Sequence, residues 1–198
     1  ATANGTSANA LAFAADVTGR ANVQAACDAA VAHFGRVDVW INNAGRGIEK
    51  KTSELNDADI SDMMQINVNS ALYGMQIALA QFRKQEGGKV QIINVSSLLG
   101  RNPTMWPPLS AYSAAKHFLN SITATLRAEL ATSDPNVVVS NVSPGVVATE
   151  FSLHYEGGPD PSNIPHSQPV EEVAAVIAGV IGTKVDEMYT KPMYHPFV

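Results

Sequence analysis

The chain has 198 residues, enough for one domain with a substantial core or for two small ones. Hydrophobic residues make up 45% and charged residues 16%, which is a globular composition with a low charged share. The formal net charge of −5 argues against the basic surface of a nucleic-acid-binding protein and against polybasic attachment to an anionic membrane.

Cysteine and histidine usage argues against two further classes of site. Cys27 is the single cysteine, so an intrachain disulfide is impossible and a cysteine-based zinc site is disfavoured. The five histidines show none of the short spacings typical of metal ligands, so we expect no metal. No apolar run approaches a membrane span, and residues 1–10 lack a basic-then-apolar signal pattern, so we expect a cytoplasmic protein that does not enter a membrane.

Alternating strand and helix patterns run along the chain. Residues 11–15 read as a short strand, and the apolar spacing that follows predicts a helix over 23–34. Further strands are predicted over 37–41, 89–95, 137–142 and 187–190. Further helices are predicted over 57–83, 110–131 and 170–181.

This alternation predicts an α/β fold: a Rossmann-like, doubly wound parallel sheet with helices on both faces, in three layers. Ligands of such sheets bind at the carboxyl ends of the strands. The predicted strands end in small or polar residues, among them Asp16, Asn42–Asn43, Ser96–Ser97 and the run Ser143–Pro144–Gly145. We therefore expect the polar side chains that take part in binding or catalysis to lie along one edge of the sheet.

Tyr112 and Lys116 lie four residues apart in a predicted helix, so they share one face. A free phenol titrates near 10, and a nearby ammonium favours the phenolate and lowers that pKa. The Tyr112 phenol can therefore act as an acid or a base, with a pKa that Lys116 adjusts. The alternative interpretation is an aromatic residue at a helix start with a solvated lysine.

Six motifs in order resemble the short-chain dehydrogenase/reductase family, over residues 11–190. They are Asp16-Val17-Thr18, Asn42-Asn43-Ala44-Gly45, Asn67, Ser97, Tyr112-x-x-x-Lys116 and Pro144-Gly145-x-x-x-Thr149. A lone YxxxK pair carries almost no information, whereas all six in this order are a specific signal.

The resemblance implies a catalytic set of Asn67, Ser97, Tyr112 and Lys116. Ser97 would donate a hydrogen bond to a carbonyl oxygen that gains charge as hydride arrives. Asn67, a mediocre helix former inside a long predicted helix, suggests a local distortion, and the family uses it to hold a proton-relaying water. Without the resemblance, Ser97 reads as a turn serine and Asn67 as a helix-surface residue.

The resemblance also implies NAD or NADP as cofactor, without selecting between them. Asp16 and Val17 would contact the adenine, and Asn43, Ala44 and Gly45 would lie beside the ribose. The remaining predicted cofactor residues, beside the nicotinamide or its ribose, are Tyr112, Lys116, Pro144, Gly145, Val147 and Thr149.

Two features depart from the family pattern. The glycine-rich phosphate-binding segment has no counterpart, so we expect residues 1–198 to be one Rossmann-type domain that lacks its first two strands within a longer polypeptide. Ser97 and Tyr112 are also 15 residues apart, two more than in many members, which fits a proline-rich loop between them.

A long segment over 151–169 is predicted to form a substrate loop or lid, since loops of this length are usually functional or disordered. We expect a small carbonyl or alcohol substrate of moderately hydrophobic character. We also expect a homodimer or homotetramer through the two long helices. Two alternatives stay open: a non-catalytic nucleotide-binding relative, and an inactive fragment without the phosphate loop.

Overall fold

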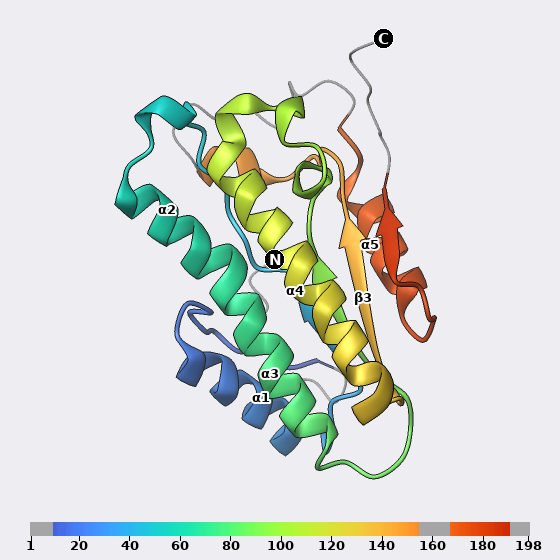
Figure 1. Ribbon diagram of the computed structural model, residues 1–198. Coiled ribbons are helices and arrows are strands. Elements are labelled where there is room, and N and C mark those ends of the chain that lie inside the picture. The colour runs from blue at the N-terminus through green and yellow to red at the C-terminus, as the bar shows by residue number, and fades with distance from the viewer. Residues whose placement is uncertain (1–9, 155–166, 191–198) are drawn as a thin grey trace.

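The computed structural model describes residues 10–154 and 167–190 (Figure 1). The strands found there form one sheet in the order β1-β2-β3-β4, and all neighbouring pairs are parallel. Their bounds are β1 (Val39–Asn42), β2 (Val90–Val95), β3 (Val137–Ser143) and β4 (Glu187–Tyr189). The α-helices are α1 (Arg20–Phe34), α2 (Asp57–Met64), α3 (Ser70–Phe82), α4 (Ser110–Ser133) and α5 (Val170–Val180).

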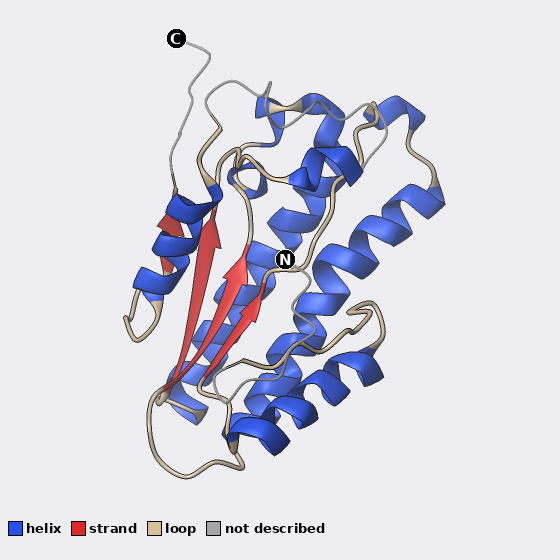
Figure 2. Ribbon diagram, turned by 180° about the vertical axis from the view of Figure 1, so that it is seen from behind, coloured by secondary structure: helices blue, strands red, loops and turns tan. Residues whose placement is uncertain are grey.

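Helices lie on both faces of this sheet, α3 and α4 on one face and α5 on the other (Figures 1 and 2). Successive strand residues point to opposite faces. Accordingly Ile92 packs into the cluster that includes Leu119 of α4, whereas the adjacent Ile93 packs into the cluster that includes Val180 of α5. The predicted three-layer α/β arrangement with a parallel sheet is confirmed.

β2 lies in the middle of the hydrogen-bonded order, and all six of its residues are buried. A strand covered on both faces is buried along its whole length, and the two polar side chains of β2, Gln91 and Asn94, are hydrogen-bonded to Ser140 and Thr123. β1 pairs only with β2 among the described strands, and Ile41 is correspondingly 41% exposed. The carboxyl ends of β1, β2 and β3 meet at one edge of the sheet, as the strand-end residues predicted.

The strand predicted over 11–15 is not formed, because residues 11–16 have irregular backbone. A strand exists only when a neighbouring strand accepts and donates its backbone hydrogen bonds. In the described part of the chain, no strand lies beside 11–15 to do so. The prediction of a strand over 11–15 is therefore wrong for the described residues.

The long helix predicted over 57–83 is present with a distortion in the middle. Asn56 caps its start, since its side chain accepts from Asp59 N at 3.0 Å while the Asp59 carboxylate accepts from Asn56 N at 2.9 Å. Between α2 and α3 the backbone widens into a π-helical turn, η2 (Gln65–Asn69), that contains Asn67. Such turns are frequently found at functional sites.

Short helical turns connect the site elements. They are η1 (Thr52–Glu54), η3 (Leu98–Gly100), η4 (Pro103–Met105), η5 (Pro107–Leu109) and η6 (Glu150–His154). Most of the substrate loop predicted over 151–169 lies outside the described residues, because 155–166 are not described.

Gly74 of α3 lies against a polar contact between α3 and β1. A β-carbon there would lie 2.0 Å from Asn42 Oδ1 and 2.5 Å from Trp40 Nε1, which are themselves hydrogen-bonded at 2.8 Å. We expect Gly74→Ala to lower the free energy of unfolding by about 1–3 kcal/mol, despite the better helix propensity of alanine. Urea denaturation measures this change.

Gly179 of α5 provides the matched control, because nothing lies within 4 Å of its β-carbon position. Gly179→Ala should raise the unfolding free energy by about 0.5–1 kcal/mol through helix propensity alone. Equal effects of the two substitutions would contradict the close packing of α3 on β1.

Candidate functional site

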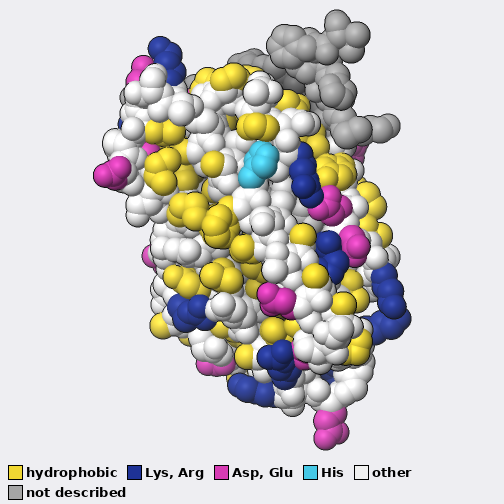
Figure 3. All heavy atoms as spheres, in the orientation of Figure 1, with side chains coloured by type: hydrophobic (Ala, Val, Ile, Leu, Met, Phe, Trp, Pro, Cys, Tyr) yellow, Lys and Arg dark blue, Asp and Glu magenta, His cyan; other side chains and the backbone are white. Residues whose placement is uncertain are grey.

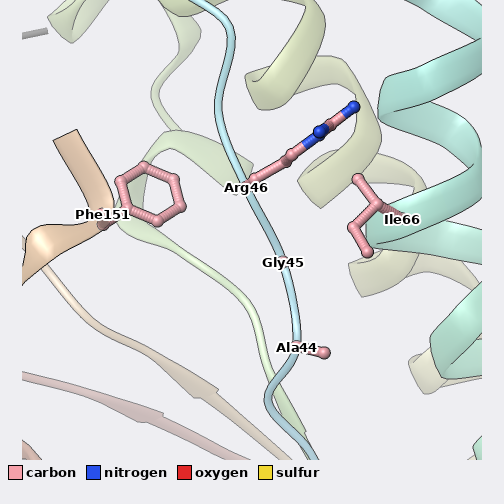
Figure 4. Close-up of a pocket in the computed structure, with 5 residues that line it drawn as sticks. All are labelled: Ala44, Gly45, Arg46, Ile66 and Phe151. Atoms are coloured by element: carbon pink, nitrogen blue, oxygen red, sulfur yellow. The ribbon is translucent and has the colours of Figure 1, made fainter. Parts of the chain in front are cut away.

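A hollow of about 480 Å³ lies beyond the carboxyl end of β1, lined by Ala44, Gly45, Arg46, Ile66 and Phe151. Figure 4 shows the chain from Ala44 to Arg46 running between Phe151 on one side and Ile66 on the other. Ala44 and Gly45 bring little side chain to this wall. A ligand can therefore approach the backbone closely at this point.

Tyr112 and Lys116 lie on the first turns of α4, on the side that faces the sheet. Lys116 Nζ lies 5.6 Å from the centroid of the Tyr112 ring and donates a hydrogen bond to Val95 O at 2.8 Å. Only 3% of Lys116 is exposed, and this burial lowers the pKa of its ammonium from 10.5 to about 8. The structure therefore places a buried cationic group beside the phenol, as the spacing predicted.

Asn67 uses its side-chain amide to hold the backbone of Arg46. Nδ2 donates to Arg46 O at 2.9 Å and to Met63 O at 3.1 Å, and Oδ1 accepts from Arg46 N at 3.2 Å. Both amide hydrogens have acceptors, and one lone pair of Oδ1 remains. The expected local distortion at Asn67 is present as η2, and its amide fixes the wall of the hollow.

Gly45 shows how closely these groups converge. A β-carbon at Gly45 would lie 2.7 Å from Asn67 Oδ1 and 3.5 Å from Lys116 Nζ. Asn67 and Lys116 thus lie close against the backbone of Gly45, and a side chain at this position would collide with Asn67 Oδ1. Gly45 from the segment after β1, Asn67 of η2 and Lys116 of α4 are brought together here.

Ser97 lies two residues beyond the end of β2, at the N-cap of η3, and is 8% exposed. Its Oγ accepts a hydrogen bond from Leu99 N at 3.1 Å, while Leu99 O accepts one from Ser113 Oγ at 2.6 Å. Ser113 is the neighbour of Tyr112, so the η3 turn connects the serine to the start of α4. The hydroxyl hydrogen of Ser97 is not used in the contact with Leu99.

Phe151 covers Tyr112 from the side of η6. The two ring centroids are 5.4 Å apart at an interplanar angle of 59°. Tyr112 also belongs to a buried cluster with Met63, Leu109 and Ala111. The ring of Tyr112 therefore lies in an apolar environment. Phe151, which also lines the hollow, packs against it.

Asp16 and Val17, which are predicted to contact the adenine, lie before α1 and are not among the residues that line the hollow. Asp16 is exposed, and its carboxylate accepts from Thr18 N at 2.9 Å and from Thr18 Oγ1 at 2.7 Å, which lowers its pKa. Val17 packs against the core between α1 and α3. Gln65 Nε2 donates to Thr18 O at 2.5 Å, which connects this turn to the π-helical turn.

The predicted nicotinamide-side residues follow β3 in one irregular segment. Pro144 is buried, while Gly145, Val147 and Thr149 are partly exposed. Asn43, on the ribose side, is exposed at the end of β1. These predicted cofactor residues thus follow β1 and β3, which lie on either side of β2, and Asp16 and Val17 occupy the segment before α1.

A row of asparagines crosses the sheet, and only Asn42 among them belonged to a motif identified from the sequence. Asn42, Asn94 and Asn141 lie in register on β1, β2 and β3. Asn42 Nδ2 donates to Asn94 Oδ1 at 2.8 Å, and Asn141 Nδ2 donates to Asn120 Oδ1 of α4 at 2.9 Å. Because Asn is a poor strand former, three of them near strand ends were a usable signal. The row fixes the strand ends relative to α4.

The described residues contain neither a metal-binding cluster nor a membrane-spanning helix. Across 10–154 and 167–190, no group of three or more histidine, cysteine or acidic side chains could hold a metal ion. Within those ranges, no helix has the length and apolar character to cross a membrane.

Comparison with known proteins gives consistent matches. The family described as short chain dehydrogenase matches residues 1–156. The chain is 38% identical over 142 residues to a diacetyl reductase [(S)-acetoin forming] of Staphylococcus epidermidis, covering 72% of this chain and 53% of the relative. The chain therefore spans about half the length of this relative and of similar curated relatives.

Solved structures match over most of the chain. A 3-ketoacyl-(acyl-carrier-protein) reductase from Brucella melitensis, complexed with NADH, has a TM-score of 0.79 at 25% identity, covering 91% of this chain and 76% of that one. A blue fluorescent protein from a metagenomic library, in complex with NADPH, has a TM-score of 0.74 at 25% identity, covering 89% and 72%.

Proposed function

Because the chain belongs to the short-chain dehydrogenase family, we propose that it transfers hydride reversibly between NAD or NADP and a carbonyl or secondary alcohol. The observation that carries this proposal is the placement of the buried Lys116 ammonium beside the Tyr112 ring, behind Gly45, which lines the hollow. A buried lysine with a lowered pKa next to a phenol is an arrangement suited to proton transfer.

The residues around the hollow fit a dinucleotide. Ala44 and Gly45 line the hollow with little side chain, so a cofactor can approach their backbone closely. Asn43, Ala44 and Gly45 would hold the cofactor beside β1, and Pro144, Gly145, Val147 and Thr149 would hold it beside β3. Asp16 and Val17 would hold the adenine end. When bound, the reduced cofactor supplies the hydride that the carbonyl carbon receives.

Tyr112 is proposed to protonate the carbonyl oxygen as it becomes an alkoxide. Lys116, whose pKa of about 8 leaves it mostly charged at neutral pH, stabilises the phenolate that remains. Ser97, whose hydroxyl hydrogen is free of the Leu99 contact, donates to the same substrate oxygen.

Asn67 is proposed as a positioning residue with one acceptor lone pair left for a water. Its amide holds Arg46 and Met63, and so fixes the segment that carries Ala44 and Gly45. The water would connect Lys116 to solvent and resupply the proton.

The proposed substrate is a small, moderately apolar ketone or aldehyde. Ile66 and Phe151 give the hollow apolar walls, and Phe151 stacks on the proposed acid. A relative at 38% identity is named a diacetyl reductase, so a small diketone is the first compound to test.

A homodimer or homotetramer is proposed through the face formed by α2, α3 and α4. Hydrophobic side chains gather over these helices in Figure 3. Ile60 of α2 and Phe118 of α4 are 45% and 46% exposed. Burying such side chains between subunits would remove apolar surface from water.

A panel of carbonyl compounds and alcohols, assayed with each cofactor, tests the proposed function. We expect oxidation of NADH or NADPH in the presence of diacetyl or a related small ketone, together with quenching or enhancement of cofactor fluorescence on binding. Binding without turnover of any compound would indicate a non-catalytic nucleotide-binding protein. The absence of both binding and turnover would contradict the proposal.

A further inference from the structure

Two buried polar residues outside the proposed catalytic set meet at the turn that follows β3. Gln168 precedes α5 and is 6% exposed, and Thr190 follows β4 and is 4% exposed. They are 22 residues apart in sequence, yet Gln168 Nε2 donates to Thr190 Oγ1 at 2.9 Å. Polar groups buried to this extent are retained where their hydrogen bonds are made.

The backbone of Gln168 forms a one-residue parallel bridge with Val147. Gln168 N donates to Val146 O at 2.9 Å, and Ala148 N donates to Gln168 O at 2.9 Å. These two bonds hold the middle of the segment from Pro144 to Thr149 in extended form.

Thr190 holds the start of the same segment. Its Oγ1 accepts from Gly145 N at 3.3 Å, in addition to the bond from Gln168, and its backbone N donates to Ser143 O at 3.3 Å. One hydroxyl oxygen therefore accepts from both Gly145 and Gln168. The turn that begins at Gly145 is connected through it to the last strand of the sheet.

We propose that Gln168 and Thr190 are positioning residues that hold the segment 144–149 in the form that receives the nicotinamide end of the cofactor. The inference rests on the proposed function, because it assigns that segment to the cofactor. Its physical basis is that Gly145, Val146 and Ala148 have their backbone groups fixed by two residues from distant parts of the chain. Loss of the Thr190 hydroxyl frees the Gly145 amide directly, and loss of the Gln168 amide removes the donor that holds this hydroxyl in place.

The test compares Thr190→Val, which removes the hydroxyl, with Thr190→Ser, which keeps it, and adds Gln168→Met, which removes the donor. Titration of NADH and NADPH by fluorescence gives the dissociation constants, and amide hydrogen exchange reports on Gly145 and Ala148 without any turnover. Thr132→Val, at an exposed position on α4, controls for the change of residue type.

We expect Thr190→Val and Gln168→Met to weaken cofactor binding about three- to tenfold, the factor that one or two lost hydrogen bonds give, and to speed exchange at Gly145. Thr190→Ser and Thr132→Val should behave as wild type. Wild-type binding and wild-type exchange in both Thr190→Val and Gln168→Met would overturn this inference alone. Failure of the wild-type protein to bind either cofactor would overturn the proposed function and this inference with it.

Discussion

Tyr112→Phe is expected to lower kcat/KM about a thousandfold while the dissociation constant of the cofactor and the melting temperature stay near their wild-type values. The substitution removes only the phenolic hydroxyl, and a positioned general acid typically contributes 10²–10⁴-fold to the rate, about this size of effect. The ring contacts with Phe151 and the Lys116 ammonium involve the ring that phenylalanine retains. Steady-state kinetics and a fluorescence titration on the same preparation measure both quantities.

Tyr73→Phe is the matched control for this experiment. Tyr73 lies on α3, where the Arg20 guanidinium stacks at 4.5 Å from its ring centroid, remote from the hollow's lining. It should leave kcat/KM unchanged. Near-normal turnover in Tyr112→Phe would show that the phenol takes no part in the reaction.

Lys116→Met is expected to abolish turnover and, at the same time, to stabilise the protein near neutral pH. Burial lowers the pKa of Lys116 from 10.5 to about 8, which corresponds to a cost of about 3 kcal/mol for keeping the charged form in the fold. The substitution also removes the hydrogen bond to Val95 O, and this loss offsets about 1 kcal/mol of the stabilisation. We therefore expect a net gain of about 2 kcal/mol in unfolding free energy at neutral pH.

The pH dependence of this gain has a definite sign. A lysine whose pKa is lower in the folded state binds fewer protons there than in the unfolded state between pH 8 and 10.5, so wild-type stability rises with pH across that window. This rise in wild-type stability is complete above pH 10.5 and is lost as the pH falls through about 8. The advantage of Lys116→Met should therefore shrink by about 2 kcal/mol between pH 7 and pH 10.

Urea denaturation of both proteins across this pH range checks the effect. Lys84→Met, at an exposed position, is the control and should show no comparable pH dependence. A Lys116→Met protein that is less stable than wild type at every pH would mean that the buried ammonium stabilises the fold rather than serving only the site.

The sheet and its helices were predictable because each element has its own local pattern. β2 is rich in β-branched apolar residues, and α4 carries Tyr112, Ala115, Lys116 and Leu119 on one buried side. The exception, the strand over 11–15, depended on a partner strand elsewhere. An apolar pattern predicts that a segment can pair, and it contains no information on whether a neighbour is present.

The candidate site was predictable to the level of residue types and less so to the level of contacts. The i, i+4 spacing placed Lys116 near Tyr112, since helical geometry fixes that distance. The clamp of Asn67 on Arg46 and the bond from Gln168 to Thr190 join segments 21 and 22 residues apart. Such contacts depend on how the elements pack, and no periodicity in the chain records them.

Transfer of deuterium tests the central claim most directly. The protein would be incubated with diacetyl or another accepted ketone and with NADH or NADPH deuterated at the C4 position of the nicotinamide. The account predicts deuterium on the carbinol carbon of the product, from one face of the ring, and none in the product with Tyr112→Phe at matched times. Bound cofactor with no deuterium in any product, across the full set of carbonyl compounds, would contradict it.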